Sequence, residues 1–61
     1  MKFKQRDKVK VKENSRFDGG RFAGAEGIVN DIYYAWHHPY RVAFEKLQSC
    51  FFHANELEKV E

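Results

Sequence analysis

Strict alternation of basic and apolar side chains from Lys8 to Lys12 (Lys-Val-Lys-Val-Lys) is the feature that most restricts what this chain can form. A period of two residues is typical of a β-strand with one face buried and the other face in water. We therefore expect Val9 and Val11 to face a core and the three lysines to line the outer face of a first strand.

Four more short segments carry strand patterns, and the five together predict an all-β domain. These segments are residues 27–34, 40–45, 49–52 and 58–60. In the second strand, Ile28 and Ile32 favour the buried face, and a bulge near Asn30 and Asp31 would accommodate the polar residue between them. Residues 53–57 suit a single 3₁₀ turn before the last strand. Five strands in this order favour a closed or nearly closed barrel.

Length and composition restrict the chain further. Sixty-one residues allow one domain, which we expect to span residues 1–61, and a domain this short has a thin stability margin. Cys50 is the single cysteine, so burial of aromatic rings (six Phe, three Tyr and one Trp) has to replace disulfides as a source of stability. With no signal-peptide pattern and no apolar run long enough to cross a membrane, we expect a cytoplasmic protein.

The strands and their flanking residues resemble the opening and closing motifs of small SH3-like barrels. Residues 6–11 (Arg-Asp-Lys-Val-Lys-Val) and 25–29 (Ala-Glu-Gly-Ile-Val) resemble the G-D-x-V-x-V and G-x-x-G-x-V opening of KOW-type barrels, in which glycine stands at the position of Arg6. Residues 40–44 and 52–60 are similar to the matching close, which ends in E-L-E-x-V. The chain is similar in particular to short SH3-like proteins of bacteriophage and prophage genomes. This resemblance implies a five-stranded SH3-like barrel and a phage-related gene.

The aromatic residues around the connection between the second and third strands are the preferred contact site. Consecutive aromatic side chains cannot all point inward, so we expect some of this group to be exposed: Tyr33, Tyr34, Trp36 and Tyr40. Exposed Trp and Tyr are typical binding anchors because they offer a large contact area with few torsions to restrict. The alternative, in which Trp36 folds back as a lid over a small core, is equally compatible with the sequence.

The loop 14–24 is long for so small a domain, which is more typical of a functional loop than of a simple connection. We expect Arg16, Phe17 and Arg21 to contribute to partner binding, because a guanidinium beside a partly exposed ring suits stacking. The alternative is that Phe17 and Phe22 anchor the loop while the arginines are solvated. The resemblance to SH3-like barrels implies that this loop and the aromatic connection lie on the same side and form one surface.

The basic first strand supports a second interpretation, nucleic-acid binding. Lys8, Lys10 and Lys12 would stand about 6–7 Å apart along one face, which roughly tracks the spacing of phosphates along a nucleic-acid strand. The alternative is a solvated outer face whose charge is neutralised by the C-terminal glutamates, at positions 56, 58 and 61.

Catalytic and metal-binding patterns are weak. Adjacent His37 and His38 rarely share one metal ion, and Cys50 with His53 lacks a second pair of ligands. Cys50 lies in an apolar run, without an oriented base or a phosphate-binding glycine loop. We therefore expect no enzymatic activity, no cofactor, no metal and no small-molecule substrate. The sequence predicts a binding module, an adaptor or regulator with a protein partner, and nucleic acid is the alternative ligand.

Overall fold

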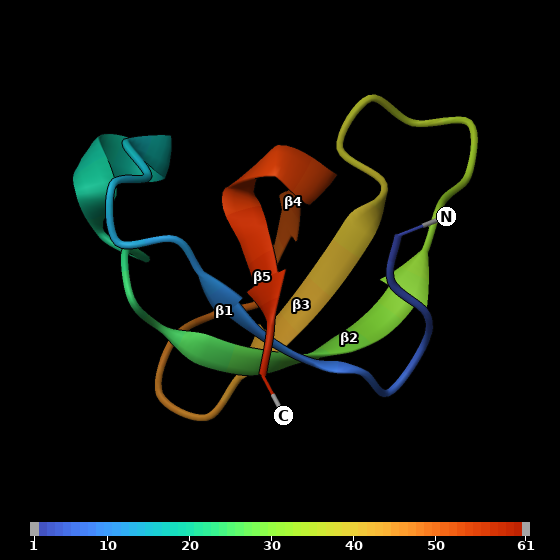
Figure 1. Ribbon diagram of the computed structural model, residues 1–61, viewed down its shortest axis with the longest axis horizontal. Coiled ribbons are helices and arrows are strands. Elements are labelled where there is room, and N and C mark those ends of the chain that lie inside the picture. Colours follow the sequence, from blue (N-terminus) through green and yellow to red (C-terminus); the bar gives the residue numbers. More distant parts are fainter. Residues whose placement is uncertain (1, 61) are drawn as a thin grey trace.

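The computed structural model describes residues 2–60, and the regular structure in them consists of β-strands and two 3₁₀ turns (Figure 1). The strands are β1 (Lys8–Val11), β2 (Glu26–Ile32), β3 (Tyr40–Phe44), β4 (Cys50–Phe52) and β5 (Leu57–Lys59). The 3₁₀ turns are η1 (Phe17–Gly20) and η2 (Ala54–Glu56). The all-β fold of five strands, with a 3₁₀ turn before the last strand, is thereby confirmed. None of the described segments is a helix long and apolar enough to cross a membrane.

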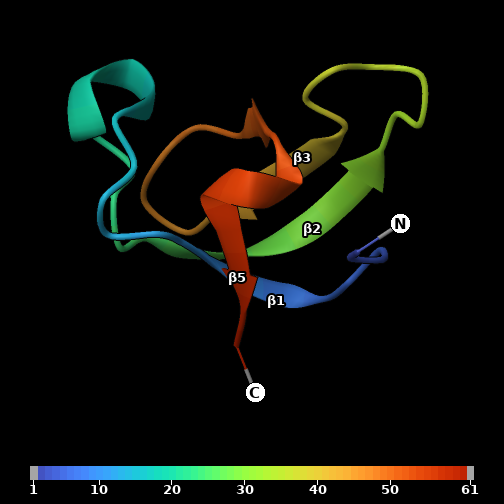
Figure 2. The same cartoon turned by 45° about the horizontal axis from the view of Figure 1, so that its top comes forward.

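The five strands form one antiparallel sheet in the order β4-β3-β2-β1-β5. The first strand therefore lies between β2 and the last strand, and β4 and β5 are the two edges of the sheet. The sheet curls into a half-barrel, and η2 carries the chain from one edge to the other across the open side (Figure 2). The two edges do not pair within residues 2–60, so the barrel is open rather than fully closed.

The inner side of the curled sheet holds an apolar core. Val9 and Val11 are fully buried, as the alternation of β1 predicts. Phe22 enters the core from the loop 14–24, and its ring centroid lies 5.3 Å from that of Phe44 and 5.6 Å from that of Phe52. The buried hydrophobic residues of the described chain are Phe3, Val9, Val11, Phe22, Val29, Tyr40, Val42, Phe52 and Leu57.

Strand β2 turns a different set of residues toward the core from the one its sequence favours. Val29 is fully buried, whereas Ile28 is 41% exposed on the outer face, so the prediction for Ile28 is wrong. The register shifts between Val29 and Asp31, which confirms the predicted bulge. The extra residue reverses the alternation, so that Ile32 packs against the core and Tyr33 turns outward. Ile28 and Val29 are both β-branched and apolar, so the sequence alone does not decide which of them faces the core. The register of the strand decides it.

Candidate protein-interaction surface

Three aromatic rings pack together on the outer face of the sheet, beside the β2–β3 connection. Tyr33 and Trp36 are stacked, with ring centroids 4.4 Å apart and planes 28° from parallel. The Phe51 ring lies 5.1 Å from Trp36 and 5.4 Å from Tyr33. A turn brings the stacked pair together, since the Trp36 N–H donates to the Tyr33 carbonyl oxygen at 2.9 Å. Phe51 faces outward because its neighbour Phe52 faces the core. We call Tyr33, Trp36 and Phe51 the aromatic cluster.

Two of the predicted anchors are strongly exposed. Tyr34 keeps 72% of its surface in water and Trp36 keeps 54%. Trp36 covers Tyr33 and Phe51, which are half-buried and lie outside the buried core, so it covers the outer face of the sheet rather than the core itself. The result is an indole held from behind by two rings, with more than half of its surface accessible to a partner.

Tyr40 does not lie on this surface, although the sequence makes it a candidate anchor. Its side chain is only 1% exposed, and its hydroxyl oxygen accepts the N–H groups of Lys2 at 3.1 Å and Phe3 at 3.3 Å. As the first residue of β3, opposite Phe52 in the register, it points to the core together with Val42. Tyr40 is therefore not part of the candidate surface. Its hydroxyl instead holds the N-terminal segment against the start of β3.

The loop 14–24 is anchored by its two phenylalanines. Phe22 is fully buried, and Phe17 is half-buried with its ring centroid 5.7 Å from that of Phe22. Arg16 and Arg21 are exposed, and the Arg21 guanidinium lies 3.5 Å from the Asp18 carboxylate. Both phenylalanines therefore anchor the loop on the core, while the two arginines stay at the surface.

A groove of about 360 Å³ joins this loop to the aromatic cluster. It is lined by Phe17, His38, Ser49, Cys50 and Phe51. Phe17 belongs to the loop 14–24, His38 to the β2–β3 connection, and the other three to the edge strand β4 and the residue before it. Figures 1 and 2 show both connections on the same side of the molecule, with η2 between them. The sequence does not mark the β4 residues of the groove, because an apolar run does not show that its strand lies at the edge of a sheet.

Three imidazole rings gather near the groove. The His37 ring centroid lies 4.8 Å from that of His38 and 5.4 Å from that of His53. His53 also caps η2, because its Nδ1 accepts the Asn55 N–H at 3.1 Å and its own N–H donates to Glu56 Oε1 at 2.8 Å. The Nδ1 lone pair is therefore occupied by this hydrogen bond. Within residues 2–60, no three His, Cys, Asp or Glu side chains are arranged to hold a metal ion.

The lysines of β1 lie beside carboxylates. Lys8 Nζ is 3.6 Å from Glu26 Oε1, and Lys10 Nζ is 2.9 Å from Glu13 Oε2. In the sheet register Lys10 lies between Glu26 on β2 and Glu58 on β5. The hydrogen bond to Glu13, together with its charge, raises the pKa of Lys10, and the same contact lowers the pKa of Glu13. Much of the positive charge on this face is thus offset.

Lys12, the third member of the predicted stripe, lies just beyond the end of β1. Its N–H donates to the Glu56 carbonyl oxygen at 2.9 Å, which ties the start of the following loop to η2. Of the glutamates that the sequence offers as neutralising groups, Glu58 lies beside the stripe and the Glu56 carboxylate caps η2 instead. Glu61 lies outside the described residues.

A half-barrel of five antiparallel strands, with a 3₁₀ turn leading into the last strand, defines a small SH3-like barrel protein. The chain is similar to the NMR structure of Bacillus subtilis protein YorP, with a TM-score of 0.85 and 18% sequence identity over 100% of this chain and 73% of the YorP chain. At this identity the likeness concerns the fold, and it confirms the expected resemblance. No family model matches the chain, and no curated protein matches it.

Proposed function

We propose that this protein is a non-enzymatic protein-interaction module, an adaptor or regulator that binds an extended segment of a partner protein along the aromatic cluster and the adjoining groove. The observation that carries the proposal is the stacked pair of Tyr33 and Trp36, which holds an indole in place while leaving 54% of its surface in water. Tryptophan and tyrosine dominate the energetics of protein interfaces. A side chain that is already held loses less conformational entropy when a partner binds.

The groove supports an extended partner segment. It runs beside β4, which pairs with β3 on one side and ends the sheet on the other within the described residues. A partner strand can add its backbone hydrogen bonds to such an edge while its side chains enter neighbouring pockets. Phe17 and Phe51 give the groove apolar walls, which favours an apolar or aromatic side chain of the partner.

The pairing of the lysines supports a protein ligand over a nucleic acid. Binding to phosphates gains affinity by releasing counterions, and this requires lysines that are free to neutralise phosphates. Lys8 and Lys10 already have carboxylate partners, and Glu58 flanks the same strand. A phage-related gene fits the same proposal. A cytoplasmic location also fits it, since the free thiol of Cys50 in the groove suits a reducing compartment.

A peptide-display selection tests the proposal. The library consists of random peptides fused to the coat protein through their C-termini, so no displayed peptide has a free C-terminal carboxylate. Selected peptides are then synthesised with amidated C-termini, and their affinities for purified variants are measured by calorimetry. Trp36→Ala is expected to weaken binding by at least about tenfold. Ile28→Ala is the matched control, because it truncates another exposed apolar side chain outside the aromatic cluster, and it should leave the affinity unchanged.

The opposite results are equally clear. If the selected peptides bind Trp36→Ala as tightly as the wild type, the aromatic cluster is not the binding site. Single- and double-stranded oligonucleotides are titrated in parallel, with Lys8→Gln as the diagnostic variant. Saturable oligonucleotide binding that falls steeply with salt and is weakened by Lys8→Gln would replace the protein-binding proposal.

A further inference from the structure

Arg6 adopts a backbone conformation that residues with long side chains rarely take. Its φ is 73°, in the left-handed region where a Cβ atom crowds the backbone and which glycine enters freely. The turn around Arg6 is fixed by β2, because the Arg6 N–H donates to the Val29 carbonyl oxygen at 2.7 Å and the Val29 N–H donates to the Asp7 carbonyl oxygen at 2.9 Å. Strain of this kind concentrates at functional sites, so an arginine at a position suited to glycine indicates a use for its side chain.

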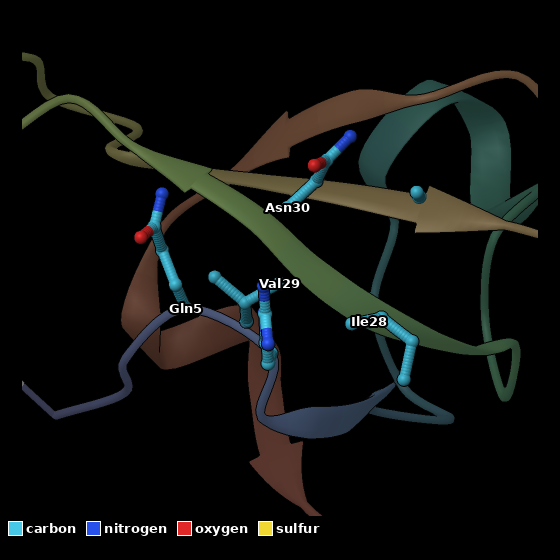
Figure 3. Close-up of a pocket in the computed structure, with 6 residues that line it drawn as sticks. Gln5, Ile28, Val29 and Asn30 are labelled. Atoms are coloured by element: carbon cyan, nitrogen blue, oxygen red, sulfur yellow. The ribbon is translucent and has the colours of Figure 1, made fainter.

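Arg6 lines a pocket on the outer face of the sheet (Figure 3). The pocket has a volume of about 400 Å³, within the range of about 300–1,000 Å³ that is typical of small-ligand sites. It shares no residue with the aromatic cluster or with the groove, and its lining residues are Gln5, Arg6, Ile28, Val29, Asn30 and Ala43.

The pocket combines polar groups with an apolar floor. Figure 3 places the amide groups of Gln5 and Asn30 on either side of β2, and Ile28 further along the same strand. Ile28 is exposed and lies opposite Ala43 in the register between β2 and β3, so the two form an apolar surface next to the amides. The lining therefore suits a ligand with one polar end and one short aliphatic group.

We propose that this pocket binds an α-carboxylate that carries an adjacent amide and a small aliphatic side chain. This chemistry is shared by the C-terminus of a peptide chain and by a free N-acyl amino acid. The site is separate from the aromatic cluster, so the proposal does not rest on the protein-interaction function above.

Each part of the ligand has a matching group. The Arg6 guanidinium forms no salt bridge within residues 2–60, and its planar fork matches a carboxylate with two parallel hydrogen bonds. Gln5 Nε2 donates to Asp31 Oδ1 at 3.4 Å, which leaves the Gln5 amide oxygen to accept the N–H of the ligand. The Asn30 amide offers a donor for the acyl oxygen, and Ile28 takes the aliphatic side chain.

The Asp31 carboxylate adds selectivity. It accepts the Gln5 amide and also the Ile32 N–H at 2.9 Å, so it is held next to the pocket as a fixed negative charge. A second negative charge on the ligand would be repelled there. We therefore expect N-acetylvaline to bind better than N-acetylaspartate.

Two-dimensional NMR of the ¹⁵N-labelled protein tests the site with N-acetylvaline, N-acetylvalinamide and a short peptide that ends in a free valine carboxylate. N-acetylvaline should produce saturable shifts in the amide peaks of residues 5–7 and 28–30, and N-acetylvalinamide should bind at least about tenfold more weakly. Tighter binding of the peptide identifies a protein C-terminus as the natural source, and tighter binding of N-acetylvaline identifies a small metabolite. Either result supports the proposed chemistry.

Variants at Arg6 separate binding from folding. Arg6→Gly removes the guanidinium and relieves the strained backbone, so it should reduce N-acetylvaline binding at least about tenfold while the thermal midpoint stays constant or rises. Lys4→Gly is the matched control, because it removes a positive charge and introduces glycine two residues away, outside the pocket lining. It should leave binding unchanged. The proposal is overturned if Arg6→Gly binds N-acetylvaline as well as the wild type, if the carboxamide binds equally well, or if no saturable shift occurs at the pocket.

Discussion

Tyr40 holds Phe3 in two ways at once. Its hydroxyl oxygen accepts the Phe3 N–H at 3.3 Å, and the two rings meet edge to face with centroids 5.3 Å apart. These contacts join the first described residues to the start of β3, thirty-seven positions later in the chain. In a domain this small, the N-terminal segment thereby becomes part of the core instead of a loose extension.

Tyr40→Phe should therefore loosen the N-terminal segment. The substitution keeps the ring but removes the acceptor for two backbone N–H groups, which we expect to lower the free energy of unfolding by about 1–2 kcal/mol. Urea unfolding measures the loss, and hydrogen exchange should show a faster rate at the Phe3 amide. Tyr34→Phe is the control, since Tyr34 is exposed and its hydroxyl forms no hydrogen bond within residues 2–60. Equal stability of Tyr40→Phe and the wild type would contradict this role.

Gly27→Ala should be among the most damaging single changes in the sheet. A Cβ atom at Gly27 would lie 2.6 Å from the Ala43 carbonyl oxygen and 2.8 Å from Val42 Cγ1, so β2 and β3 would have to separate. We expect a loss of at least about 2 kcal/mol, measured by urea unfolding. At Gly24 an added Cβ meets nothing closer than 3.7 Å, and the cost comes from its φ of 78°, so Gly24→Ala should lose only about 1 kcal/mol. The reverse ranking of the two variants would refute the close approach of the strands.

The ion pair between Lys10 and Glu13 should give stability a pH dependence. The hydrogen bond from Lys10 lowers the pKa of Glu13 below its ordinary value of 4.5, so the contribution is present above that value and is lost as the pH falls through the folded-state pKa. The same bond raises the pKa of Lys10 above 10.5, so that contribution is complete below 10.5 and is lost as the pH rises through the folded-state value. The pair therefore stabilises the fold across the neutral range.

Glu13→Gln tests this dependence. Its free energy of unfolding should be lower than that of the wild type at about pH 7, and the difference should shrink as the pH falls through the folded-state pKa of Glu13, where the wild-type carboxylate takes up its proton. Both side chains are in contact with solvent, so the effect is small and should weaken with added salt. Glu45→Gln serves as control because Glu45 is exposed and forms no salt bridge within residues 2–60. A difference that stays constant with pH would exclude this ion pair as its source.

The alternation of β1 and β3 predicts these two strands from the sequence, because in both of them alternate residues enter the core. Strand β2 does not, since Ile28 and Val29 are both β-branched and the bulge after Val29 reverses the alternation partway along. Only the pairing of β2 with both neighbouring strands decides that Val29 is buried and Ile28 exposed.

The candidate site is also predictable only in part from the sequence. Clustered aromatic residues indicate that some must be exposed, and Tyr34 and Trp36 are. Which ones are buried depends on the position of each residue in the sheet, and Tyr40 faces inward because it begins β3. The contribution of Phe51 and the approach of His53 to the adjacent histidines depend on contacts between distant segments, which local patterns do not encode.

The most direct test of the proposed function is an NMR titration of the ¹⁵N-labelled protein with a selected, C-terminally amidated peptide. Trp36 is the single tryptophan of the chain, so its indole N–H gives one unambiguous peak at the centre of the aromatic cluster. We predict a saturable shift of this peak, together with shifts of Tyr33, Phe51 and the groove residues. An indole peak that stays in place while the peptide binds, with shifts confined to the lysines of β1, would contradict the account.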